Sequence, residues 1–469
     1  MRIQIIILLA IACCNYIKAQ QFYFGADLSY VNEMENCGAV YKMNGIATDP
    51  FVIFKNSGTN LVRLRLWHTP SWYDNLNEGM RYSDFDDVRL SIIRAKAQGM
   101  EVLLAFHLSD NWADPSKQVA PQAWTSVLNN LPALEDSLYN YIYQTLDKLA
   151  SENLLPELVQ IGNETNRGIL LSQQVNDAGW VLDWNRNSAL FNTAISAIHN
   201  IEEVYQKDIK IALHIAEPAD VPWYIEQFHD HGVEDFDVIG ISYYYQWHDQ
   251  SIDEVGDIIS DLKETYPEKD VMILETAYPW TSTNADNANN ILSIAYPGYT
   301  PFTPTRQKDW MIALTQEVIR NGGTGVVYWE PAWVSTGCRT QWAVGSSWDN
   351  ATFFDHNDDL IENGGIEWMS HLYEFPTSIE NVSNNKNRIQ IVQSGNGLRL
   401  IRLGDGIAHG ELNIGYYLMD GRRVERIFVI PNWVYNEMNI DFPQLPVGCY
   451  LINISDRHKS LGSGVLFFK

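Results

Sequence analysis

Eight short apolar segments constrain the fold of this 469-residue chain more than any other feature. They lie at residues 22–27, 61–67, 102–107, 158–162, 211–214, 238–243, 271–275 and 326–329. Between them, side chains such as Leu138, Ile142, Leu146 and Leu149 recur at helical spacing. Strands that are apolar on both faces are typical of a parallel sheet covered by helices, and eight such units predict a (β/α)8 TIM barrel. A doubly wound open sheet is the alternative, but no glycine-rich phosphate-binding turn follows the first segment.

The pattern changes after Phe375. Residues 376–387 are rich in Ser and Asn and predict a linker between residues 20–375, which form the barrel, and the rest of the chain. Residues 388–469 alternate apolar and polar side chains over short lengths. We expect a small antiparallel β-sandwich there, so the fold class is α/β with an appended β domain.

The first 19 residues are typical of a signal peptide. An apolar run follows Arg2, and the small residue Ala19 precedes the expected cleavage point. We therefore expect an exported protein that is secreted, periplasmic or displayed on the cell surface. A lipid anchor at Cys13 or Cys14 is the less favoured alternative, because the residues before Cys13 lack the usual leucine.

The charge and the aromatic content restrict the class of ligand. The formal net charge is −26, so nucleic acid and anionic membrane surfaces would be repelled. The 16 Trp and 24 Tyr supply flat rings of the kind that stack against sugars. No apolar run after the first 19 residues approaches the roughly 18 residues of a membrane span, so we expect no transmembrane helix.

Polar side chains end most of the predicted strands. In order along the chain these residues are Asp27, Arg63 or Arg65, His107, Asn163 with Glu164, His214, Tyr243 and Glu275, and Trp329 ends the eighth strand. Each of them alone is explained by a salt bridge or a structural role. In a barrel, however, the carboxyl ends of all strands meet at one face, where ligands bind.

Glu164 and Glu275 are 111 residues apart, which at about 37 residues per βα unit places them on the fourth and seventh strands. These strands face each other across a barrel, so both carboxyls would enter one cleft. Such a pair suits glycoside hydrolysis. A catalytic zinc site is disfavoured, because His107 and His214 lie on different strands without the short spacing of metal ligands.

Seven segments together resemble one family. They are Gly25–Ser29, Val62–Trp67, Phe106–Pro115, Gln160–Glu164, Gly240–Tyr244, Leu274–Pro279 and Tyr328–Trp333. In this order they are similar to the endo-β-1,4-galactanases of glycoside hydrolase family 53, members of the retaining barrel clan A. The resemblance covers most of residues 22–375.

The resemblance implies a retaining mechanism with Glu164 as acid/base and Glu275 as nucleophile, their carboxyls about 5 Å apart. Burial and the charge of Glu275 would raise the pKa of Glu164, while Arg63 would keep Glu275 ionised. Asn163 would bind the sugar 2-hydroxyl, and Trp329 would form the floor of the subsite at the cleaved bond. The remaining residues that the resemblance places in substrate binding are Asp27, Arg63, His107, Asp110, Trp112, His214 and Tyr243.

The chain departs from the family pattern at several positions. Ala105 replaces a usual Asp on the third strand, and residues 243–247 and 214–217 also differ. Bacterial relatives often bind calcium after the seventh strand, but residues 281–290 offer few anionic ligands here. We therefore expect no metal and no cofactor.

Three cysteines remain after residue 19, namely Cys37, Cys338 and Cys449. Cys37 follows the first strand and Cys338 the eighth, and the loops after these strands are neighbours in a closed barrel. We hypothesise a disulfide between Cys37 and Cys338 in an oxidising compartment; two unpaired cysteines are the alternative.

The function that we expect is endo-hydrolysis of β-1,4-galactan, the polysaccharide of type I arabinogalactan and pectic side chains, by a monomeric enzyme. Two alternatives stay open. The first is another β-1,4-glycanase of the clan, a mannanase or a xylanase. The second is a surface protein that binds glycans without turnover.

Overall fold

The computed structural model describes residues 21–173, 181–341 and 343–375, and seven strands between residues 388 and 468. The predicted signal peptide (1–19) and linker (376–387) lie outside the described residues. The chain divides into two compact units, one that extends to Leu372 and one formed mainly by Tyr373–Lys469. Each unit is described separately below.

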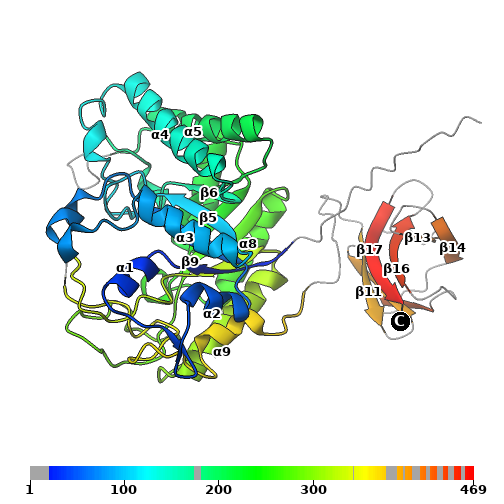
Figure 1. The fold of residues 1–469 in the computed structure, drawn as a ribbon. Helices are drawn as coiled ribbons and strands as arrows, with labels where there is room; N and C mark the ends of the chain where they lie inside the picture. Colours follow the sequence, from blue (N-terminus) through cyan, green and yellow to red (C-terminus); the bar gives the residue numbers. More distant parts are fainter. Residues whose placement is uncertain are drawn as a thin grey trace, which may run out of the picture. The chain divides into compact units, whose positions relative to one another are not determined.

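The first unit is a closed barrel of eight parallel strands, which confirms the predicted (β/α)8 fold (Figure 1). The strands are β1 (Tyr23–Asp27), β4 (Leu61–Leu66), β5 (Glu101–Phe106), β6 (Leu158–Ile161), β7 (Lys210–Ala216), β8 (Val238–Ser242), β9 (Asp270–Thr276) and β10 (Gly325–Tyr328). Each strand pairs with its neighbours in chain order, and β1 pairs with β10 to close the ring. Each of the eight predicted apolar segments overlaps one of these strands.

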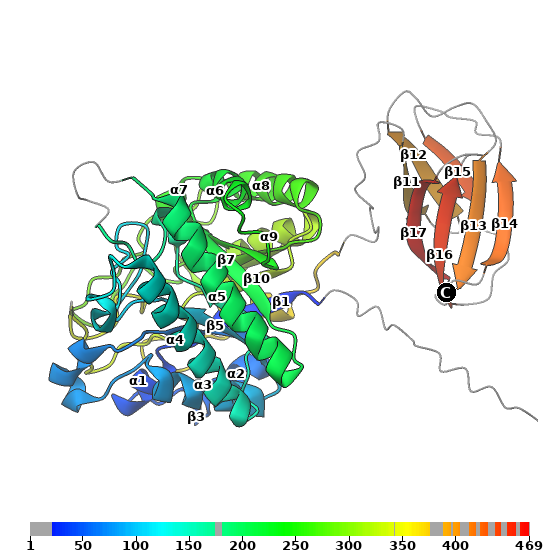
Figure 2. The same cartoon turned by 90° about the horizontal axis from the view of Figure 1, so that it is seen from above.

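Helices surround the barrel, as Figures 1 and 2 show from two directions. They are α1 (Val31–Asn36), α2 (Pro50–Asn56), α3 (Phe85–Ala97), α4 (Leu131–Ser151), α5 (Trp184–Tyr205), α6 (Val221–Asp230), α7 (Tyr245–His248), α8 (Ile252–Thr265) and α9 (Pro304–Arg320). A short hairpin of β2 (Lys42–Met43) and β3 (Ile46–Ala47) follows α1. No helix in the described part of the chain is long and apolar enough to cross a membrane.

Side chains from all eight strands fill the barrel interior. The cluster comprises Tyr23, Leu61, Leu103, Ala105, Leu158, Ala212, Val238, Met272, Leu274 and Val327, each at most 8% exposed. Ala105, which stands where the family usually has Asp, therefore faces packed apolar side chains. The interior is a core and not a pore, so a ligand can bind only at an end of the barrel.

The pairing of β9 is irregular where it approaches the carboxyl end of the barrel. Ile241 pairs with Ile273, but the next residue, Ser242, pairs with Glu275, so one residue of β9 has no counterpart on β8. A β-bulge of this kind re-aims the side chains that follow it. The bulge thus sets the direction of Glu275.

The second unit contains two antiparallel sheets. One has the order β11-β12-β15 and the other β14-β13-β16-β17. The strands are β11 (Arg388–Ser394), β12 (Gly397–Leu403), β13 (Leu412–Leu418), β14 (Arg423–Val429), β15 (Glu437–Asp441), β16 (Gly448–Ser455) and β17 (Ser460–Phe468). The described side chains of β13 and β16 are buried and are spaced two residues apart, so those of each strand lie on one face of the sheet; they are Leu412, Ile414, Tyr416, Ile452 and Ile454. That the two sheets pack as a sandwich stays a prediction.

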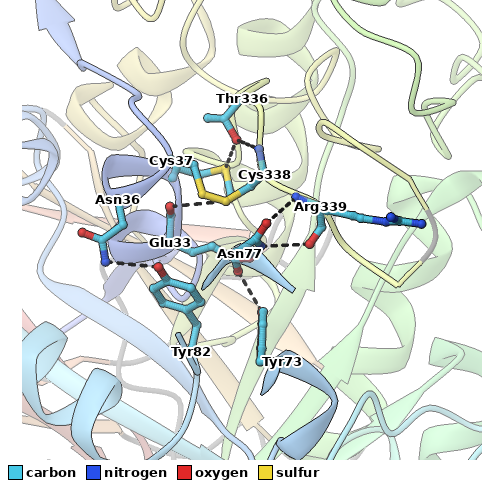
Figure 3. The surroundings of a disulfide bond; sticks show 10 residues. Glu33, Asn36, Cys37, Tyr73, Asn77, Tyr82, Thr336, Cys338 and Arg339 are labelled. Atoms are coloured by element: carbon cyan, nitrogen blue, oxygen red, sulfur yellow. Dashed lines mark hydrogen bonds between the residues drawn. A yellow bond between two sulfur atoms is a disulfide. The ribbon is translucent and has the colours of Figure 1, made fainter. Parts of the chain in front are cut away.

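A disulfide joins Cys37 and Cys338, as the sequence predicts, with their Cα atoms 5.5 Å apart (Figure 3). Cys37 caps the carboxyl end of α1, and Cys338 lies in the loop after β10. Asn77, from the loop after β4, hydrogen-bonds the backbone of the next residue, Arg339, in both directions, at 2.9 and 2.8 Å. Three loops at the carboxyl end of the barrel are thereby held together.

Removing this bond is expected to lower the stability of the barrel substantially. The two cysteines are 301 residues apart, and a cross-link over such a span restricts the unfolded chain strongly. We expect the double variant Cys37→Ala/Cys338→Ala to lose about 2–4 kcal/mol of unfolding free energy, measured by urea denaturation. Wild-type protein in reductant should match the variant. An unfolding midpoint that reductant leaves unchanged would contradict the prediction.

Candidate active site

The carboxyl ends of the strands surround a cleft of about 630 Å³. Both predicted catalytic carboxyls, Glu164 and Glu275, line this cleft, together with Asn163. Five aromatic side chains contribute to its walls, namely Trp112, Tyr244, Trp247, Trp329 and Trp348. The site therefore combines two carboxyl groups with the flat apolar surfaces that sugar rings pack against.

The backbone presents the two glutamates differently. Glu164 follows β6 after two residues and has a left-handed conformation (φ 46°), so the chain turns there and the side chain stays partly exposed. Non-glycine residues adopt this conformation at a cost, and such positions cluster at functional sites. Glu275 is still part of β9, directly after the bulge, and is only 6% exposed.

Arg63 connects three side chains at the base of the cleft. Its guanidinium lies 2.8 Å from Glu275 Oε1 and 2.8 Å from Asp27 Oδ2, and it donates to Asn163 Oδ1 at 2.7 Å. The guanidinium of Arg63 is buried, so water competes little for these contacts. Tyr244 donates a second hydrogen bond to Glu275, to Oε2 at 3.3 Å. Both oxygens of Glu275 thus receive donors that favour the ionised form.

The surroundings of the two carboxyl groups affect their pKa values differently. Burial raises the pKa of Glu164 to about 8, and the charge of Glu275 adds to this shift. Burial also raises the pKa of Glu275, but there the Arg63 guanidinium opposes the effect at direct contact. We therefore assign the proton to Glu164 and the negative charge to Glu275 at neutral pH.

A hydrogen-bonded network fixes Asn163 beside the pair. Its Nδ2 donates to the Ala113 carbonyl at 2.9 Å, which leaves one Nδ2 hydrogen for a ligand. Gln160 and His214 both lie 3.1 Å from Asn163 Oδ1. Burial lowers the pKa of His214 well below its usual range, so the imidazole is neutral and adds no charge to the site.

Comparison with known proteins identifies the family of the chain. The model of the family described as Glycosyl hydrolase family 53 matches residues 23–363. The chain belongs to this family. It is a glycoside hydrolase of family 53, and the cleft with its two glutamates lies within the matched region.

Individual relatives of this family 53 hydrolase span its barrel. An arabinogalactan endo-β-1,4-galactanase of Cellvibrio japonicus is 46% identical over 352 residues, which is 75% of this chain and 91% of the relative. An endo-β-1,4-galactanase of Bacillus subtilis is 34% identical and covers 75% of this chain and 76% of the relative. The family 53 catalytic domain of Ignisphaera aggregans has a TM-score of 0.68 at 31% identity, with 76% of this chain and 97% of that domain covered.

One residue of the predicted site is misplaced. Tyr243 does not face the cleft: its ring stacks on Trp310 of α9 at 6.1 Å, and its hydroxyl donates to the Gln250 carbonyl at 2.6 Å. Side chains alternate along an extended chain, so the next residue, Tyr244, points inward and reaches Glu275. The correct tyrosine of the cleft is Tyr244.

Four other predicted residues do not line the cleft. Asp27 is fully buried and holds Arg63. His107 is 2% exposed and lies under the edge of Trp112. Asp110 accepts hydrogen bonds from the backbone of Thr69 and Gln122, and His214 is buried as described above. Asp27, His107 and His214 are thus buried, whereas Asp110 is partly exposed.

The remaining predicted residues, Trp112, Asn163 and Trp329, do line the cleft. Trp329 lies between Trp112 and Trp348, with ring centroids 5.8 and 4.6 Å away. Trp348 also donates to the Trp329 carbonyl at 3.1 Å. Sequence reasoning missed Trp348, because it belongs to a long loop after β10 and not to a strand end.

Arg65 is a second support that strand-end reasoning left undecided. Its guanidinium lies 4.1 Å from the centre of the Trp112 ring and forms a buried ion pair with Glu330 at 2.8 Å. A cation held over an indole fixes the orientation of the ring. Arg63 therefore holds the carboxyl group of Glu275, whereas Arg65 supports the aromatic wall of the cleft.

Two aspartates in the loops after β9 and β10 are bonded to protein donors. Asp286 accepts hydrogen bonds from Ala288 N, Ser346 N and Ser335 Oγ at 2.6–2.7 Å. Asp349 accepts from Ala285 N at 2.7 Å and Asn290 Nδ2 at 2.6 Å, and its Oδ2 lies 2.9 Å from the same Ser335 Oγ. Because both carboxylates already bond protein donors, these contacts favour the prediction that no calcium binds here. Within the described residues, no group of three His, Cys, Asp or Glu side chains could hold a metal ion.

We accordingly expect chelation to leave the enzyme unchanged. A ligand stabilises a protein only when it binds the folded form, so removal of calcium by EDTA should shift the melting temperature by less than about 1 °C. Differential scanning calorimetry with EDTA and with added calcium provides the measurement. A melting temperature that rises with calcium concentration would show that the Asp286 loop binds the ion.

Proposed function

We propose that this enzyme cleaves β-1,4-galactan, as found in type I arabinogalactan and pectic side chains, within the chain and with retention of configuration. The observation that carries the proposal is the pair of Glu164 and Glu275 in one aromatic cleft, with Arg63 bound to one of them alone. The galactanase names of the relatives support the choice of substrate. Clan relatives that cleave mannan or xylan, and glycan binding without turnover, receive no such support.

In the first step, Glu164 donates its proton to the glycosidic oxygen while the Glu275 carboxylate attacks the anomeric carbon. The bond between that carbon and the glycosidic oxygen breaks. The leaving galactan then carries a free hydroxyl group, and the remaining galactosyl unit is bound to Glu275 as an ester. Arg63 and Tyr244 keep Glu275 charged and oriented for this attack.

In the second step, the ionised Glu164 takes a proton from water, and the water oxygen attacks the anomeric carbon. The ester bond breaks, so Glu275 is again a carboxylate and Glu164 is again protonated. This exchange of roles follows from the electrostatics. While Glu275 is esterified it has no charge, so the pKa of Glu164 falls and the residue can act as a base.

The test is the release of reducing sugar from galactan, mannan, xylan and cellulose by the purified enzyme. We expect release from galactan and much less from the other three. Proton NMR of the earliest products should show the β anomer at the new reducing end, as retention requires. Preferred cleavage of another polysaccharide, or an α anomer as the first product, would contradict the proposal.

We also propose that the enzyme is exported and acts as a monomer. The apolar amino-terminal segment supports export, as does the Cys37–Cys338 disulfide, because such bonds persist in oxidising compartments. Mass spectrometry of the protein isolated from its native cells should find Gln20 at the amino terminus. Light scattering of the same sample should give the mass of one chain.

A further inference from the structure

A glutamine beside the cleft ties two of its loops together. Gln246 is a half-buried residue of α7, which follows β8. Its side chain reaches the backbone of residues 291–294, in the loop after β9. Gln246 belongs to residues 243–247, a segment in which the chain differs from the usual sequence of the family.

Three hydrogen bonds form this link, which we call the Gln246 link. Nε2 donates to the Ile291 carbonyl at 2.7 Å. Oε1 accepts from the backbone N–H groups of Ser293 at 2.6 Å and of Ile294 at 2.9 Å. Both acceptor sites of the amide oxygen are used, so the side chain has one defined orientation.

Two apolar side chains at the link, those of Trp247 and Ile291, line the cleft. Trp247 is 47% exposed and Ile291 is 49% exposed, and both line the cleft that contains Glu164 and Glu275. Trp247 packs edge-on against Tyr244 at 4.9 Å, and Tyr244 hydrogen-bonds Glu275. These apolar surfaces therefore lie close to the reacting centre and are open to a ligand.

The loop after β9 is also anchored on its other side. Ile291 N donates to the Ser347 carbonyl at 3.1 Å, and Asn350 Nδ2 donates to the Leu292 carbonyl at 2.8 Å. These bonds do not involve α7. Loss of the Gln246 link would therefore let α7, and with it Trp247, shift relative to Ile291, while the loop after β9 keeps its other anchors.

We propose that Gln246 is a positioning residue that holds Ile291 in register with Trp247, so that the two side chains form one apolar surface for a galactosyl unit beside the cleaved bond. A galactopyranose ring has a face of C–H groups that packs on such a surface. The inference rests on the proposed function, and it concerns affinity for the polysaccharide and not the chemical step.

The variant Gln246→Met tests the proposal, because Met has similar length and no hydrogen-bonding amide. We expect KM for galactan to rise about tenfold while kcat stays within about twofold, since the groups that act in the transition state are untouched. Ile291→Ala should raise KM similarly. In the double variant, Gln246→Met should add little to Ile291→Ala, because both changes remove the same contact.

The control is Asn192→Ala, which removes another side-chain amide that bonds a backbone carbonyl, that of Gly232, away from the cleft. It should leave KM unchanged. The proposal would be overturned if Gln246→Met lowered the melting temperature but left KM unchanged. It would also be overturned if the increase in KM of the double variant equalled the product of the increases in the two single variants. If wild type cleaves another polysaccharide of the panel, the proposed function fails, and the same KM comparison on that polysaccharide decides whether Gln246 positions Ile291.

Discussion

Glu275→Ala is expected to lower kcat on galactan by about 10⁴- to 10⁶-fold, because the nucleophile is lost and the glycosyl-enzyme cannot form. The change also leaves Arg63 with Asp27 as its remaining charged partner in the cleft. Binding should survive, since the aromatic walls are intact. The measurement is reducing-sugar release, with galactan affinity followed in parallel by isothermal titration calorimetry.

Chemical rescue makes this prediction specific. Alanine opens space where the carboxylate stood, so azide can attack the anomeric carbon from the same face when the substrate has an activated aryl leaving group. We expect the product to be an α-galactosyl azide. The matched control is Glu217→Ala, which truncates a glutamate just beyond the end of β7 that does not line the cleft. Wild-type activity in Glu275→Ala would remove Glu275 from its assigned role, and an equal loss of activity in the control would show that the effect is not specific to Glu275.

The sequence predicts the barrel and the position of both glutamates for one physical reason. Parallel strands covered on both faces must be apolar throughout, so a carboxylate at the end of such a run marks the face where the core stops. Glu164 and Glu275 both interrupt apolar runs in this way. Their meeting in one cleft then follows from strand order, because the barrel closes through β1 and β10.

Other features could not be predicted, because they depend on local irregularities. The side on which Tyr243 and Tyr244 lie depends on where β8 ends relative to the bulge in β9, which no residue pattern marks. Asp27 also ends a strand, yet the buried guanidinium of Arg63 covers it. Trp348 and Ile291 reach the cleft from long loops whose course is set by hydrogen bonds such as the Gln246 link.

Glu164→Gln is expected to lower activity only on substrates whose leaving group must be protonated. Glutamine keeps the shape of the side chain but cannot protonate a leaving group, so kcat on galactan should fall about 10²- to 10⁴-fold. An aryl β-galactobioside with an activated leaving group needs no proton at that step. Its conversion to the glycosyl-enzyme, followed as a burst of released aryl alcohol in stopped-flow experiments, should proceed at nearly the wild-type rate.

The pH dependence of kcat/KM provides an independent test of Glu164 as the acid. The pKa of Glu164 is raised to about 8, so the wild-type residue keeps its proton through neutral pH and loses it as the pH rises further. For wild type we therefore expect kcat/KM on galactan to decline above about pH 8, because the free enzyme then lacks its acid. In Glu164→Gln the residual activity should have no such alkaline limb. If the variant kept the limb at the same pH, a different group would titrate there, and the raised pKa of Glu164 could not explain the wild-type profile.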